Sequence, residues 1–160
     1  MEGRYNHPMT LLVLGIGQSL RGDDAAGLEA VRLWQQTYPQ TAKRVQVELS
    51  ELPGLALLDR LEGMEAAILV DALQTNSTPG TIHRLGPEEL AAFTLDSQSA
   101  HGWGVAETLA LGRSLYPWLA QCRITLIGIA GSAFEMGAAL SPAVQAALPE
   151  AAALIEKEVQ

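Results

Sequence analysis

The sequence lacks several features that mark specialised classes of protein. Its single cysteine, Cys122, is too few for an intrachain disulfide or a cysteine zinc site, so a reducing compartment is expected. No run of 18 uninterrupted apolar residues is present, and Glu135 divides the longest candidate, 124–148. No small-residue cleavage site follows the apolar run 9–17, as a secretion signal would require. We therefore expect a cytoplasmic protein without a membrane-spanning helix.

Basic and aromatic residues are also scarce. Ten Lys and Arg stand against 18 Asp and Glu, which gives a net charge of −8. An acidic surface repels phosphate backbones and anionic lipids, so neither nucleic acid nor membrane is expected as a partner. Aromatic residues make up 5% of the chain and apolar residues 48%, so Leu, Ala, Val and Ile must fill the core. Length and composition are those of one globular domain, 1–160.

Short apolar runs alternate with helical patterns along the chain, which is typical of a parallel α/β sheet. Strands are predicted at 10–15, 45–48, 66–70, 81–85 and 123–129. Helices are predicted at 25–38, 54–61, 104–115 and 141–160. The predicted fold class is α/β, with a twisted, mostly parallel five-stranded sheet and helices on both faces. Residues 81–85 are short enough to form an antiparallel edge strand.

Three further local features are expected. Pro39 should end the first long helix, and Pro149 should kink or restart the last one, because proline lacks a backbone N–H. The polar stretch 86–100 has no clear periodicity, and its length suggests a functional loop.

Polar side chains that could carry chemistry fall where predicted strands end and helices begin. Asp23 and Asp24 follow the first strand, Asp71 ends the third, and His101 precedes the helix at 104–115. Ligand sites of open α/β sheets gather at the carboxyl ends of strands. Two carboxylates and an imidazole suit a divalent transition metal such as Zn, Ni, Mn or Cd, and leave coordination positions open.

Each of these residues also has a purely structural interpretation. Asp24 could be a helix N-cap, Asp71 an Asx turn at a strand end, and His101 a polar loop residue. Asp23 is a weaker candidate, either supporting the site or capping a helix. From composition and spacing alone, the metal site and these interpretations remain open.

Other catalytic and binding motifs fit poorly. Gly15-Ile-Gly17 resembles the start of a dinucleotide-binding fingerprint, but Leu20 occupies its third glycine position. Ser132 lacks both glycines of a nucleophile elbow. Cys122 precedes a strand rather than a helix, so we interpret it as a core or strand-edge residue.

Three motifs together resemble the nickel–iron hydrogenase maturation endopeptidases, which process the hydrogenase large-subunit precursor. They are Leu14-Gly-Ile-Gly17 followed by Leu20-Arg-Gly-Asp-Asp24, then Ile68-Leu-Val-Asp-Ala72, and Ser99-Ala-His-Gly-Trp-Gly-Val-Ala106. The resemblance runs from about residue 10 to the C-terminus, in the family's order and spacing.

The resemblance implies a protease that removes the C-terminal extension of the precursor after nickel insertion. It implies that Asp24, Asp71 and His101 are both the catalytic set and the metal ligands. The Ni²⁺ would arrive with the precursor beside a Cys-x-x-Cys motif, with cleavage after the His or Arg that follows, and Zn²⁺ or Cd²⁺ would substitute in vitro. Alternatives are another metal-dependent hydrolase on this fold and a non-catalytic nickel-binding assembly chaperone.

Overall fold

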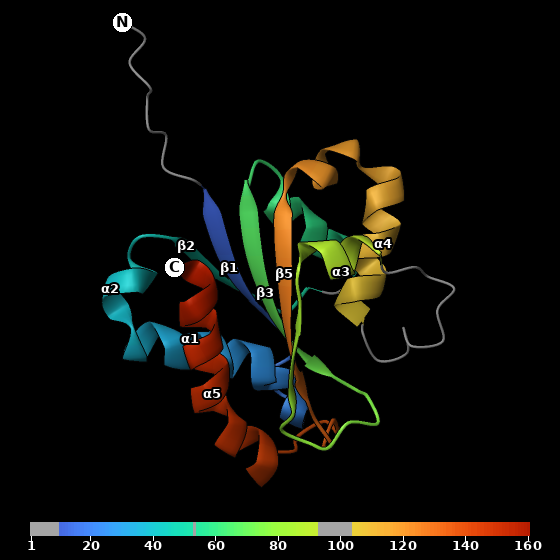
Figure 1. Ribbon diagram of the computed structural model, residues 1–160. Helices are drawn as coiled ribbons and strands as arrows, with labels where there is room; N and C mark the ends of the chain where they lie inside the picture. Colours follow the sequence, from blue (N-terminus) through green and yellow to red (C-terminus); the bar gives the residue numbers. More distant parts are fainter. Residues whose placement is uncertain (1–9, 53, 93–103) are drawn as a thin grey trace, which may run out of the picture.

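The computed structural model describes residues 10–52, 54–92 and 104–160 (Figure 1). A five-stranded sheet runs through the centre, in the order β2-β1-β3-β5-β4. Neighbouring strands are parallel except β4, which pairs antiparallel with β5. The predicted sheet, including its antiparallel edge strand, is confirmed. The strands are β1 (Leu11–Ile16), β2 (Gln46–Ser50), β3 (Ala66–Leu73), β4 (Ile82–Leu85) and β5 (Arg123–Ala130).

Helices cover both faces of this sheet (Figure 1). On one face, α1 (Ala26–Thr37) packs with α5 (Pro142–Val159). The other face carries the α-helices α3 (Pro87–Ala91) and α4 (Gly104–Leu115), with the 3-10 helices η2 (Gly54–Leu61) and η4 (Pro117–Gln121). Two further helices are the 3-10 turn η1 (Gly22–Ala25) and the short α2 (Pro39–Ala42).

The two faces explain why the central strands are apolar without alternation. Successive side chains of a strand point to opposite faces. Leu11 and Val13 therefore pack under α1 and α5, whereas Leu12 and Leu14 pack under η2 and α4. Because both faces are covered by helices, every position of β1 must be apolar.

One of three local predictions is confirmed, and two were wrong. The first long helix ends directly before Pro39: α1 stops at Thr37, and Pro39 occupies the first position of α2, where its missing N–H costs nothing. Pro149 does not restart the last helix: it lies inside α5, which runs unbroken over 18 residues because its buried side chains pack against the core. Residues 87–91 form α3 instead of irregular chain.

Within the part of the chain that the structure describes, no helix is long and apolar enough to cross a membrane.

Candidate active site

A pocket of about 250 Å³ opens at the carboxyl ends of the parallel strands. Its wall is formed by the end of β1, the turn η1, the segment after β2, η2, Asp71 of β3 and the start of α4. This is the position at which open α/β sheets bind their ligands. The pocket is lined by Ile16, Gly17, Gln18, Asp24, Glu51, Leu52, Gly54, Leu57, Asp71, Gly104, Val105 and Thr108.

Asp24 reaches the pocket from η1, the 3-10 turn that joins β1 to α1. Its Oδ2 accepts a hydrogen bond from the backbone N–H of Gln18 at 3.0 Å. The turn closes tightly because Gly17 has a φ of +151° and a Cβ there would lie 1.9 Å from the carbonyl oxygen of Asp24. The helix-cap interpretation of Asp24 is wrong, since Ala25 precedes α1 and no side chain caps that helix.

Asp71 lies within β3 and does not end it. The strand continues to Leu73 because Asp71, Ala72 and Leu73 remain paired with Gly128, Ile129 and Ala130 of β5. The prediction that Asp71 terminates its strand, and the alternative of a strand-end Asx turn, were therefore wrong. Its Oδ1 accepts a hydrogen bond from the N–H of Ala72 at 2.8 Å.

Burial raises the pKa of Asp71 to about 8, and the negative charge of Asp24 adds to the rise, although the Ala72 hydrogen bond lowers it. The Asp71 carboxyl is therefore mostly protonated at neutral pH. A cation placed between two such carboxyl groups favours their ionised forms and displaces the proton.

The third predicted ligand, His101, lies outside the described residues. Gly104, three positions later in the sequence, lines the pocket at the start of α4. Among residues 10–52, 54–92 and 104–160, no group of three or more His, Cys, Asp or Glu side chains could hold a metal ion. The structure thus brings Asp24 and Asp71 to one pocket, and both belong to the predicted set.

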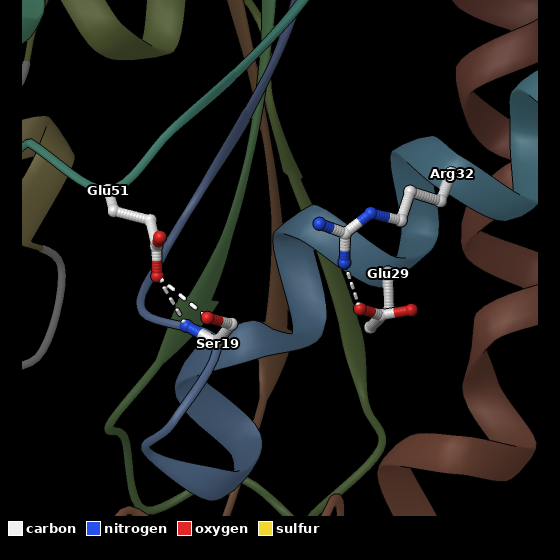
Figure 2. A network of polar contacts seen from close by, with 4 residues as sticks. All are labelled: Ser19, Glu29, Arg32 and Glu51. Carbon is white, nitrogen blue, oxygen red and sulfur yellow. Dashed lines mark hydrogen bonds and ion pairs between the residues drawn. The ribbon is translucent and has the colours of Figure 1, made fainter.

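Glu51 is a third carboxylate on the pocket wall, and the sequence did not single it out. Its Oε1 accepts hydrogen bonds from the N–H of Ser19 at 2.7 Å and from the Ser19 hydroxyl at 2.9 Å (Figure 2). These bonds lower the pKa of Glu51, and the positive charge of Arg32 contributes. Its place directly after β2, at the carboxyl end of a parallel strand, is the signal that could have revealed it.

Figure 2 also shows Arg32 paired with Glu29 on α1, whereas Ser19 and Glu51 join the loop after β1 to the loop after β2. The loop after β1 is therefore tied to the loop after β2 at the mouth of the pocket. Both bonding groups are exposed, so this link orients the loops more than it stabilises the fold.

Asp23 points away from the pocket. It is completely buried, and its carboxylate accepts four hydrogen bonds from Ser132, Ala133 and Ser141. Cys122 is also buried, and burial raises the pKa of its thiol to about 11. Its interpretation as a core residue is confirmed, and a thiol of that pKa is a poor nucleophile at neutral pH.

Comparison with known proteins identifies the family. A family model described as hydrogenase maturation protease matches residues 35–158. The chain belongs to this family. It is 32% identical over 155 residues to the hydrogenase expression/formation protein HupD of Rhodobacter capsulatus, covering 96% of this chain and 72% of that one. It is 30% identical over 144 residues to the hydrogenase 2 maturation protease of Escherichia coli, covering 89% and 86%.

Solved structures of the family share the fold. The hydrogenase maturating endopeptidase HybD of Escherichia coli superposes with a TM-score of 0.72 at 27% identity, over 94% of this chain and 92% of that one. HybD of Thermococcus kodakarensis gives 0.70 at 27% identity, over 95% and 100%. The resemblance found in the sequence is therefore confirmed, and this member of the family is a hydrolase of the endopeptidase type.

Proposed function

We propose that this endopeptidase removes the C-terminal extension of a nickel–iron hydrogenase large-subunit precursor, and that it recognises the nickel ion already bound there. Asp24, Asp71 and His101 would bind that ion. The observation that supports the proposal most directly is the shared pocket of Asp24 and Asp71, which 47 sequence positions separate.

The chemistry of the pocket suits a cation. Asp24, Asp71 and Glu51 each place a carboxyl group on its wall, and no Lys or Arg lies among the lining residues that the structure describes. Burial, with a smaller contribution from the charge of Asp24, raises the pKa of Asp71, and a divalent ion would favour the ionised form of its carboxyl group. His101 enters the proposal through the sequence alone, three positions before Gly104 on the pocket wall.

Ligand counting favours an ion that arrives with the substrate. Two carboxylates and one imidazole make an open site without a thiolate, which should hold a free transition metal weakly. Thiolates of the precursor would hold nickel firmly, and the protease would complete its coordination. An unloaded precursor lacks both the charge and the open coordination positions, so it should bind poorly.

The two carboxyl groups and the histidine would also act on the bound substrate. Docking through a fixed ion would place the scissile bond beside the pocket and convert an encounter into an oriented complex. Asp71, protonated in the free protein, gives up its proton when a cation binds. A precursor bound to this pocket therefore meets two ionised carboxylates.

The decisive experiment compares nickel-loaded with nickel-free precursor, each incubated with chelator-treated enzyme, and measures the precursor mass. We expect shortening of the loaded precursor only. D24N and D71N should lose at least about 100-fold in rate, as removal of an orienting contact commonly does. The matched control is E29Q, which removes one negative charge on α1 outside the pocket lining.

Each result has a distinct meaning. Equal cleavage of both precursors would refute nickel recognition while leaving the endopeptidase intact. Failure to cleave either precursor would refute the proposed substrate. Full activity of D24N and D71N with cleavage of the loaded precursor would show that the ion is recognised elsewhere.

A further inference from the structure

Two consecutive aspartates of η1 lie in opposite surroundings. Asp24 lines the pocket, whereas Asp23 is 0% exposed on the other side of the turn. Successive side chains of a 3-10 helix point about 120° apart, because it has about three residues per turn. The same short turn therefore connects the pocket to a polar cluster around the buried Asp23.

That cluster lies in the segment 131–141, between β5 and α5. Oδ2 of Asp23 accepts hydrogen bonds from the N–H groups of Ser132 at 2.8 Å and Ala133 at 3.0 Å, and from the Ser141 hydroxyl at 2.8 Å. Oδ1 accepts the N–H of Ser141 at 2.7 Å. Burial by itself would raise the pKa of Asp23, but these four bonds outweigh it and lower the pKa.

Backbone contacts hold the same two segments together. The N–H of Asp23 donates to the carbonyl of Ala133 at 2.6 Å, and the N–H of Gly137 donates to the carbonyl of Leu20 at 2.7 Å. Gly22 has a φ of +56°, and a Cβ there would lie 2.2 Å from the Ala133 carbonyl oxygen. The segment 131–141 therefore holds η1 on the side of Asp23.

On the pocket side, Gly17 and Gln18 hold η1. Gly17 packs against the carbonyl of Asp24, and the N–H of Gln18 bonds the Asp24 carboxylate. The turn that carries Asp24 is thus fixed between the loop after β1 and the segment 131–141. The Asp23 carboxylate supplies most of the side-chain bonds on the second side.

We propose that Asp23 is a positioning residue that fixes the Asp24 carboxylate in the pocket before substrate binds. The inference rests on the proposed function, because its kinetic test measures cleavage of the nickel-loaded precursor. Without the Asp23 carboxylate, the part-buried N–H groups of Ser132, Ala133 and Ser141 lose their acceptor, and η1 must shift to satisfy them. A displacement of about 1 Å in a site of this kind costs about 100-fold in rate.

The test compares D23N and D23A with the control E156Q. Asparagine keeps the volume of Asp23 but turns an N–H₂ group toward at least one of the donors. The control residue, Glu156, is also a buried carboxylate, with 8% of its surface exposed. It accepts bonds from Trp34, Thr41 and Gln160 where α1 meets α5, and it does not line the pocket. E156Q therefore reproduces the loss of stability without touching η1.

Two measurements separate positioning from stability. The first is the hydrogen exchange of the Gln18 amide, which bonds Asp24 directly. It should accelerate at least about 10-fold in D23N and stay within twofold of wild type in E156Q. The second is cleavage of the nickel-loaded precursor below the melting temperature of each variant. D23N should lose about 100-fold in kcat/KM, with kcat falling as well, because a displaced Asp24 no longer meets and orients the substrate's ion correctly.

D23A should show the same pattern in stronger form. A folded D23N with wild-type Gln18 exchange and wild-type kcat would overturn the inference. If D23N and D23A both fail to fold while E156Q folds, Asp23 maintains the fold and not the site, which also overturns it. If the wild-type protein leaves the precursor uncut, the proposed function fails, and Gln18 exchange alone decides the role of Asp23.

Discussion

Asp24 and Asp71 line one pocket, and the charge of Asp24 helps to raise the pKa of Asp71 to about 8. Asp24 comes from the turn after β1 and Asp71 from the middle of β3, the strand next to β1 in the sheet. The parallel register of those strands brings the two carboxyl groups together. Four predictions test this arrangement and the fold that maintains it.

The first prediction concerns the pH dependence of stability at Asp71. Its pKa is about 8 in the folded protein against 3.8 in the unfolded chain, so the folded state binds the extra proton between these values. The stabilisation is complete below pH 3.8 and is lost as pH rises through 8. D71N removes this loss. Between pH 5.5 and 8.5 we expect wild type to lose about 3 kcal/mol of stability relative to D71N, because the folded state holds the extra proton over about 2.5 of these pH units and one unit corresponds to about 1.4 kcal/mol.

Urea unfolding of both proteins at pH 5.5 and 8.5 measures this difference. D24N serves as the comparison, since removing the neighbouring charge should lower the pKa of Asp71 and flatten the pH dependence only in part. A difference between D71N and wild type that does not change with pH would contradict the prediction.

The second prediction concerns His101. H101A should lose cleavage of the nickel-loaded precursor by at least about 100-fold, because an open site loses one of three protein ligands. Wild-type activity should fall as pH drops below about 6.5, since a protonated imidazole cannot coordinate. Rates from intact-mass spectrometry across pH 5–8 measure both effects. Wild-type cleavage by H101A would remove this residue from the proposed site.

The third prediction concerns Gly17. G17A should destabilise the fold by about 3 kcal/mol or more, because the added methyl group would lie 1.9 Å from the Asp24 carbonyl oxygen and φ is +151°. The matched control is G63A, at a glycine with φ +82° but no atom within 4 Å. G63A should cost only about 1 kcal/mol. Thermal unfolding compares the two, and equal losses would mean that the contact with Asp24 is not tight.

The fourth prediction concerns Pro149, which lies exposed inside α5. P149A should stabilise the protein by about 1–3 kcal/mol, because alanine restores a helical hydrogen bond that proline cannot donate. The control is P142A, at the first position of the same helix, where the N–H has no helical partner. P142A should give no gain. A loss of stability in P149A would contradict the prediction and show that the proline ring makes stabilising contacts despite its exposure.

The sequence alone determined the sheet and two of the pocket residues. Side chains alternate along a strand and recur at 3.6 residues along a helix, so an apolar run or stripe predicts its element without knowledge of its neighbours. The five strands of the sheet followed from such runs. Asp24 and Asp71 were predicted to meet because parallel strands end at the same edge.

Only the tertiary structure decided which partner each polar group has. Asp23 and Asp24 are identical residues side by side, and nothing local shows that one bonds Ser141 across 118 positions while the other lines a pocket with Asp71. Pairing with β5 extended β3 past Asp71, and core packing kept Pro149 within α5. Local geometry fixes the elements, but hydrogen bonds and burial between distant segments form only when the whole chain has folded.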